Sequence, residues 1–148
     1  MLKDFLLENG YSQTRLVKNF YWPTKNQNES QSAFNLRKSE YWIPKADVPI
    51  FVFLPRVNND GVGLELQYLC HNFYDMTWRS ILGVSRTPSL KISSLISGLI
   101  ERWSGTTQQV FFTMNKQLQT GVRGALTNLL ERLYYRAINR EEGEWEFS

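Results

Sequence analysis

Few residues in this chain have the chemistry that catalysis requires. His71 is the single histidine and Cys70 the single cysteine, so a zinc site of thiolates and imidazoles has too few ligands. Because the two residues are adjacent, their side chains diverge on a strand or a helix, which disfavours a Cys–His catalytic pair. The glycine motifs of phosphate-binding loops and nucleophile elbows are absent. We therefore expect no catalytic residue, no metal site and no cofactor.

Aromatic and basic residues alternate around a polar segment in the first third of the chain. Rings of this kind stack on the bases of a single strand, while cations contact its phosphates. The alternative is that the rings pack into the core and the cations remain in water. The candidate nucleic-acid-binding residues in this part of the chain are Lys18, Tyr21, Trp22, Lys25, Arg37, Lys38, Tyr41, Trp42 and Lys45.

Further cations follow in the last third. Arg132, Arg136 and Arg140 are four residues apart, so on a helix they share one face, where a phosphate would relieve their repulsion. Their place near a helix C-terminus also explains them, because the dipole favours cations there. Arg123 lies within a G-x-x-G motif at 121–124, which can clamp a nucleic-acid backbone. In a long helix, the same glycines instead allow another element to approach closely.

The charge of the chain is divided between a basic body and an acidic end. Residues 1–140 hold all 17 lysines and arginines but only 10 of the 14 acids, which leaves a net charge of +7. The last eight residues hold four glutamates together with Trp145 and Phe147. We interpret residues 141–148 as a tail whose two rings dock on a partner, or whose acids compete with a polyanion for the body. A frayed terminus is the alternative.

These residues must be positioned by a single α+β domain over residues 1–140. Two apolar runs flank Asn58-Asn59-Asp60-Gly61, a sequence that favours a turn. We therefore predict a small antiparallel sheet with a hairpin near 50–69. Apolar residues at helical spacing predict helices over 88–103 and about 107–140, and a candidate helix over 73–82. Residues 23–32 contain no apolar side chain after Pro23 and predict an exposed loop, and residues 33–45 are expected to be extended.

The lack of catalytic groups and the basic charge favour a non-catalytic structural or adaptor subunit. The leading hypothesis places it in a nucleoprotein assembly: replication or transposition machinery, a CRISPR-type effector or a phage particle. Its partners would be other protein subunits and nucleic acid, with no membrane, in the cytoplasm or in a virion assembled there. The alternative is a protein–protein adaptor or a secretion-type chaperone that does not contact nucleic acid. An enzyme with dispersed carboxylates is the least favoured hypothesis.

Overall fold

The sheet at the centre of this protein is parallel, and the predicted antiparallel sheet is wrong. The computed structural model describes residues 2–17 and 24–146, and from residue 140 onward the backbone alone. Within these residues, β1 (Ile50–Phe53), β2 (Ile81–Ser85) and β3 (Gln108–Phe112) pair in the order β1-β2-β3. Ile50 pairs with Ile81, and Ile81 pairs with Gln108. Every residue of β2 is buried, as expected for a central parallel strand.

The predicted hairpin at 50–69 fails because its second half is a helix. Residues 60–72 form α3 (Asp60–Asn72), whose buried positions Gly63, Leu66, Leu69 and Cys70 have helical spacing. Leu64, Leu66 and Tyr68 alternate with polar residues, as on a half-buried strand, yet Leu64 is 58% exposed and Leu66 is fully buried. The Asn-Asn-Asp-Gly sequence begins this helix, with Asp60 N donating to Asn58 Oδ1 (2.8 Å).

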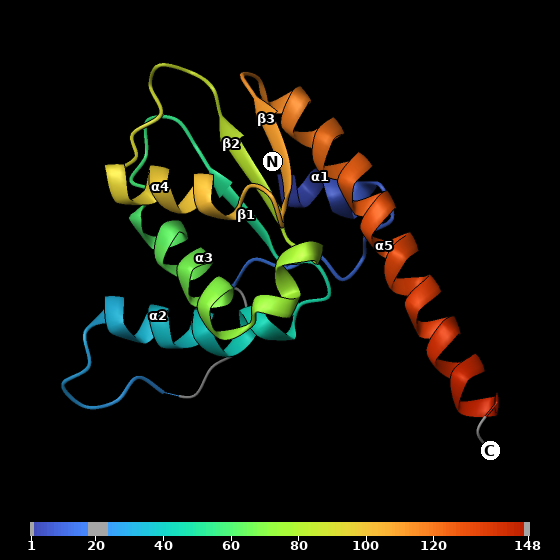
Figure 1. Cartoon of the computed structure of the whole chain (residues 1–148). Coiled ribbons are helices and arrows are strands. Elements are labelled where there is room, and N and C mark those ends of the chain that lie inside the picture. The colour runs from blue at the N-terminus through green and yellow to red at the C-terminus, as the bar shows by residue number, and fades with distance from the viewer. Residues whose placement is uncertain (1, 18–23, 147–148) are drawn as a thin grey trace.

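Helices cover both faces of the sheet (Figure 1). On one face, α3 and α4 (Ser94–Trp103) enclose a core that includes Phe53, Leu82 and Ile100. On the other face, α1 (Leu2–Glu8) and α5 (Asn115–Glu146) enclose a core that includes Ile81 and Leu129. The molecule is therefore a three-layered arrangement in which the connections from β1 to β2 and from β2 to β3 run through α3 and α4.

The other predicted elements also change in the structure. The segment at 33–45 is α2 (Gln31–Trp42) followed by the short 3₁₀ helix η2 (Ile43–Lys45), and not an extended chain. The segment at 73–82 is the 3₁₀ helix η3 (Tyr74–Arg79) and the start of β2. The helix expected at 88–103 begins at Ser94, where the Ser93 hydroxyl accepts from Ile96 N (3.2 Å).

The single helix expected at 107–140 is instead β3 followed by α5. The apolar stripe of α5 agrees with its sequence, since Leu118, Val122, Leu126 and Leu129 are buried. The polar segment at 24–30 has no helix or strand, and α2 begins at Gln31. Within the described residues, every helix is too short or too polar to cross a bilayer.

Close approach of α5 to the sheet depends on glycine at position 121. A Cβ atom built on Gly121 would overlap Cγ1 of Val110 in β3, whereas a Cβ on Gly124 would have nothing within 4 Å. The G-x-x-G sequence at 121–124 therefore lies inside a packed helix and forms no clamp between two helices. This agrees with the alternative that its glycines allow close packing.

We predict opposite effects on stability for two alanine substitutions in α5. Gly124→Ala should stabilise the protein by up to about 1 kcal/mol, because alanine has the higher helix propensity and the added methyl has free space. Gly121→Ala gains the same propensity but overpacks the branched Val110, so we expect a net loss of about 1–2 kcal/mol. Urea unfolding of both variants measures the difference. Equal stabilisation by the two would contradict the packing of α5 on β3.

Helix α2 is joined to α3 by a hydrogen bond from the Ser39 hydroxyl to Glu65 Oε1 (2.7 Å). Burial raises the pKa of the Glu65 carboxyl above its ordinary value of 4.5, and the bond from Ser39 lowers it in part. A carboxyl with a raised folded pKa stabilises the fold in its protonated form. That contribution is complete below its unfolded pKa and is lost as the pH rises through its folded pKa.

We therefore predict that Glu65→Gln stabilises the protein near pH 7, where the native carboxylate is ionised at a cost. Below about pH 4 the wild-type side chain is also neutral, so the difference between the two proteins should shrink. Melting temperatures across this range test the prediction, with the exposed Glu101→Gln as the matched control. A destabilising effect of Glu65→Gln near pH 7 would show that the ionised form is the favoured one.

Candidate nucleic-acid interface

The structure describes six of the nine predicted nucleic-acid-binding residues of the first third, and these six lie in the polar segment, on α2 and on η2. Lys18, Tyr21 and Trp22 lie outside the described residues, and Lys25 is exposed. The Arg37 guanidinium pairs with the Glu29 carboxylate through two hydrogen bonds of 2.9 and 3.0 Å. This hydrogen bond lowers the pKa of Glu29 and raises that of Arg37. The positive charge of Arg37 is therefore balanced within the chain.

Four further candidates lie on α2 and η2, and each is buried or contacts another residue of the chain. Lys38 is buried, with 9% of its surface exposed. Tyr41 and Trp42 meet edge to face with ring centroids 5.0 Å apart, and Lys45 Nζ lies 4.4 Å from the Tyr41 ring centroid. Tyr41 and Lys45 are exposed and could still contact a ligand. These residues lie in the layer of α3, at the end of the molecule opposite the carboxyl ends of the strands (Figure 1).

The predicted candidates of the last third lie on α5, across the sheet from α2 (Figure 1). Arg123 and Arg132 are exposed. The Arg136 guanidinium lies 3.9 Å from the Trp78 ring centroid. The side chains of Arg140 and Trp145 and the whole of Phe147 lie outside the described part of the chain. The predicted cations thus belong to at least two separate surfaces.

A different set of cations meets at the carboxyl ends of the strands. Three loops lie side by side there, at 54–59, 86–93 and 113–114. Arg56 N donates to Ser89 O (3.0 Å), and Arg86 N donates to Phe112 O (2.8 Å). The exposed cations on these loops and on the first turn of α5 are Arg56, Arg86, Lys91 and Lys116. We call these four residues the basic rim.

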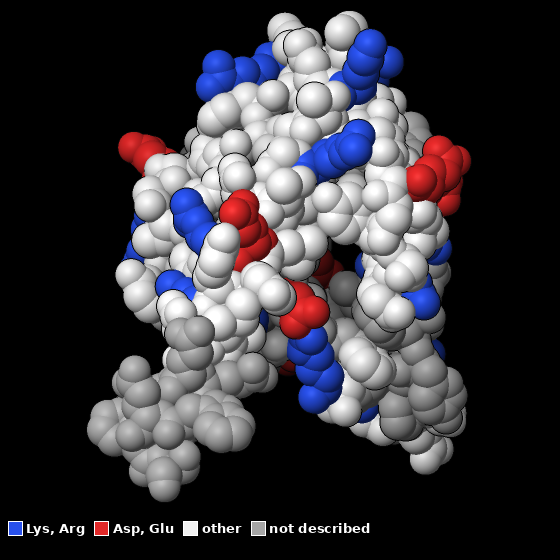
Figure 2. All heavy atoms as spheres, turned by 90° about the vertical axis from the view of Figure 1, so that its right-hand side faces the viewer, with Lys and Arg blue, Asp and Glu red and all other residues white. Residues whose placement is uncertain are grey.

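Little negative charge opposes the basic rim. Asp60 is the only acid in residues 54–60, 86–94 and 113–118. Figure 2 shows lysine and arginine side chains at the top of the molecule, the end at which Figure 1 places the carboxyl ends of the strands. Helices α3, α4 and α5 begin directly after the loops at 54–59, 86–93 and 113–114, so the positive ends of their dipoles lie next to these loops.

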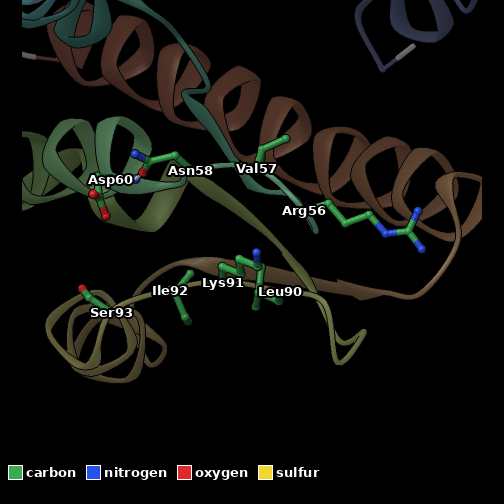
Figure 3. A pocket seen from close by; sticks show the side chains of 8 residues that line it. All are labelled: Arg56, Val57, Asn58, Asp60, Leu90, Lys91, Ile92 and Ser93. Atoms are coloured by element: carbon green, nitrogen blue, oxygen red, sulfur yellow. Dashed lines mark hydrogen bonds between the residues drawn. The ribbon is translucent and has the colours of Figure 1, made fainter.

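A hollow of about 600 Å³ lies between two loops of the rim (Figure 3). In Figure 3, Lys91 lies beside Leu90 on the loop after β2, and the Arg56 side chain extends away from the other seven residues. The hollow is thus open to solvent and borders the rim on one side. Its lining residues are Arg56, Val57, Asn58, Asp60, Leu90, Lys91, Ile92 and Ser93.

Buried polar side chains fix the backbone of these loops. The Asn59 side chain, 2% exposed, accepts from Leu54 N (3.0 Å) and donates to Leu54 O (3.0 Å), Val57 O (3.3 Å) and Lys91 O (3.1 Å). It therefore ties the loop after β1 to the loop after β2. Arg56 has a φ of 63°, a left-handed conformation that such surrounding bonds must hold in place.

Side chains also order the loop after β2 and the start of α5. The hydroxyls of Ser85, Thr87 and Ser89 are linked in sequence by contacts of 2.9 and 3.1 Å. The Arg86 guanidinium lies 3.9 Å from the centroid of Phe111, whose side chain is 44% exposed. Gln117 Oε1 accepts from Thr113 N (2.8 Å) and Met114 N (3.3 Å). These contacts hold the loop after β2 and the start of α5 in place, and so position the backbone that carries the rim residues.

The described residues include the single cysteine and the single histidine, but they form no metal-binding cluster. Residues 2–17 and 24–139 contain no group of three histidine, cysteine or acidic residues that could hold a metal. Burial raises the pKa of Cys70 to about 12, although Arg102 lowers it in part, so the thiol is not a nucleophile near neutral pH. The exposed His71 meets Trp103 edge to face, with ring centroids 6.5 Å apart.

We compared the chain with protein-family models, with curated proteins and with solved structures, and none of the three comparisons gave a match.

The Asn59 side chain gives a direct test of how the rim is held together. Asn59→Ala removes its four hydrogen bonds and leaves carbonyl groups without this donor, so we predict a loss of about 2–4 kcal/mol in unfolding free energy. The control is Asn58→Ala at an exposed neighbour, with an expected loss of about 1 kcal/mol or less. The urea unfolding midpoints of the two variants measure this difference in stability. Similar midpoints would mean that Asn59 does not join the loops.

Proposed function

We propose that this protein is a non-catalytic subunit of a nucleoprotein assembly that binds the nucleic-acid backbone through its basic rim. The observation that carries the proposal is the arrangement of Arg56, Arg86, Lys91 and Lys116 on adjoining, hydrogen-bonded segments. Phosphates repeat along a nucleic acid, so several spaced cations contact it at once and release its counterions. This keeps the function expected from the sequence but moves the binding surface.

A polymer fits the rim better than a small anion does. The cations stand on three loops instead of converging inside one enclosed cavity, and Arg56 extends away from the other residues of the hollow (Figure 3). The exposed ring of Phe111 beside Arg86 could also stack on an unpaired base. A small anion would be bound more tightly by an enclosed pocket in which the polar groups converge.

Protein partners are the second part of the proposal. Leu95 at the start of α4 is 85% exposed, and Met114 before α5 is 59% exposed. A partner protein that contacts this end of the molecule would bury both side chains, which is the adaptor role that we propose beside nucleic-acid binding. Docking through Trp145 and Phe147 stays a prediction from the sequence.

The basic rim is tested by removing two of its charges. We predict that the double variant Lys91→Gln, Lys116→Gln binds a fluorescent single-stranded oligonucleotide more weakly than the wild type. Log affinity falls with log salt, and each lost phosphate contact makes the slope about 0.7 less steep. The slope of the double variant should therefore be about 1.4 less steep than that of the wild type. Fluorescence polarisation over a series of salt concentrations measures both quantities.

The matched control removes the same charge from the predicted surfaces outside the rim. Lys25→Gln with Arg123→Gln alters two exposed residues and should leave the slope close to that of the wild type. If the control loses as much affinity as the rim variant, the rim is not the binding surface. No binding of the wild type at low salt would remove nucleic acid from the proposal.

A further inference from the structure

The end of β3 carries an aromatic ring that the surrounding helices leave partly in water. Val110 and Phe112 are buried in the core beneath α5. Because side chains alternate along a strand, Phe111 points to the opposite face of the sheet, which α3 and α4 cover. Its register partner in β2, Val84, is buried in the core on that face, whereas Phe111 is 44% exposed. The core beneath α3 and α4 therefore ends before it covers this ring.

The Arg86 side chain lies over one side of the ring. The parallel register sets Ser85 beside Phe112, so Arg86 is the first residue beyond the end of β2. Its backbone N–H donates to Phe112 O (2.8 Å), and its guanidinium lies 3.9 Å from the centroid of Phe111. A cation this close to the centroid of a ring is attracted by its negative face. Because Arg86 is itself exposed, the ring and the guanidinium form one surface that is open to solvent, which we call the stacking platform.

The stacking platform lies within the basic rim. Arg86 belongs to the rim, and Phe111 is followed by the loop at 113–114 and then by Lys116 on the first turn of α5. Gln117 Oε1 accepts from both backbone N–H groups of this loop (2.8 and 3.3 Å), which holds the connection between the ring and Lys116 in place. Proteins that bind single strands use the same combination, in which rings stack on bases and neighbouring cations contact phosphates.

We propose that the stacking platform binds one unpaired base, and that the basic rim therefore binds single-stranded nucleic acid by its bases as well as by its phosphates. This inference rests on the proposed function and names the form of nucleic acid that the rim accepts. In a duplex each base is already stacked between its neighbours and must be extruded before it can contact a protein ring. A ring also stacks on any of the bases, so the platform recognises an unpaired base without reading a sequence.

An abasic strand separates stacking from phosphate contacts, because it has the same backbone charge and no bases. We expect the wild type to bind an end-labelled thymine oligonucleotide about tenfold more tightly than an abasic strand of equal length, the effect of one stacked base. Phe111→Leu keeps an apolar side chain but has no ring, so it should bind both strands as weakly as the wild type binds the abasic one. Phe111→Tyr keeps the ring and should keep the preference. Fluorescence polarisation at one salt concentration measures these dissociation constants.

A second ring provides the matched control. Tyr134→Leu removes a side chain that is 64% exposed on the C-terminal half of α5, and it should keep the preference for thymine. Unchanged binding of the abasic strand by Phe111→Leu is expected, and it shows that this variant is folded with its rim intact. If the wild type binds both strands equally, or Phe111→Leu keeps the preference, the stacking platform is overturned and the rim still binds phosphates. If the wild type binds neither strand, the proposed function fails and the platform fails with it.

Discussion

The parallel pairing of β2 with both of its neighbours determines most of this structure. Parallel strands cannot be joined by a tight turn, so α3 and α4 must return the chain from the end of one strand to the start of the next. As a result, all three strands end, and the helices after them begin, at one edge of the sheet. That constraint gathers Arg56, Arg86 and Lys91 from distant parts of the sequence.

The same sheet anchors α5 through close contacts that depend on glycine. A Cβ on Gly83 in β2 would lie 2.8 Å from Cδ1 of Leu118, so this part of α5 is held against the strands. The helix then continues past the body of the protein (Figure 1).

The sequence predicts the helical stripes well and the strands poorly, for a physical reason. Ile96, Ile100 and Trp103 are buried at helical spacing, as their sequence indicates, because a helix carries its own periodicity. The strand β3 has just five residues, and in the sequence its Val110 continues the apolar stripe of α5. The sequence pattern therefore predicts one helix over both elements. Leu64, Leu66 and Tyr68 fit a strand or a helix, and burial against β1 and α4 decides between them.

The candidate site could not be found in the sequence because its cations are separated by 60 residues from Arg56 to Lys116. Local clustering instead pointed to Arg37 and Lys38, which belong to one helix. A helix next to a core must bury part of its surface, so Lys38 is buried, and Arg37 pairs with a nearby Glu29. Charged residues that are neighbours in sequence can therefore be buried or paired within the chain, and they are then not free to contact a ligand. Cations placed singly after successive strands have fewer such partners, and a parallel sheet is what brings them together.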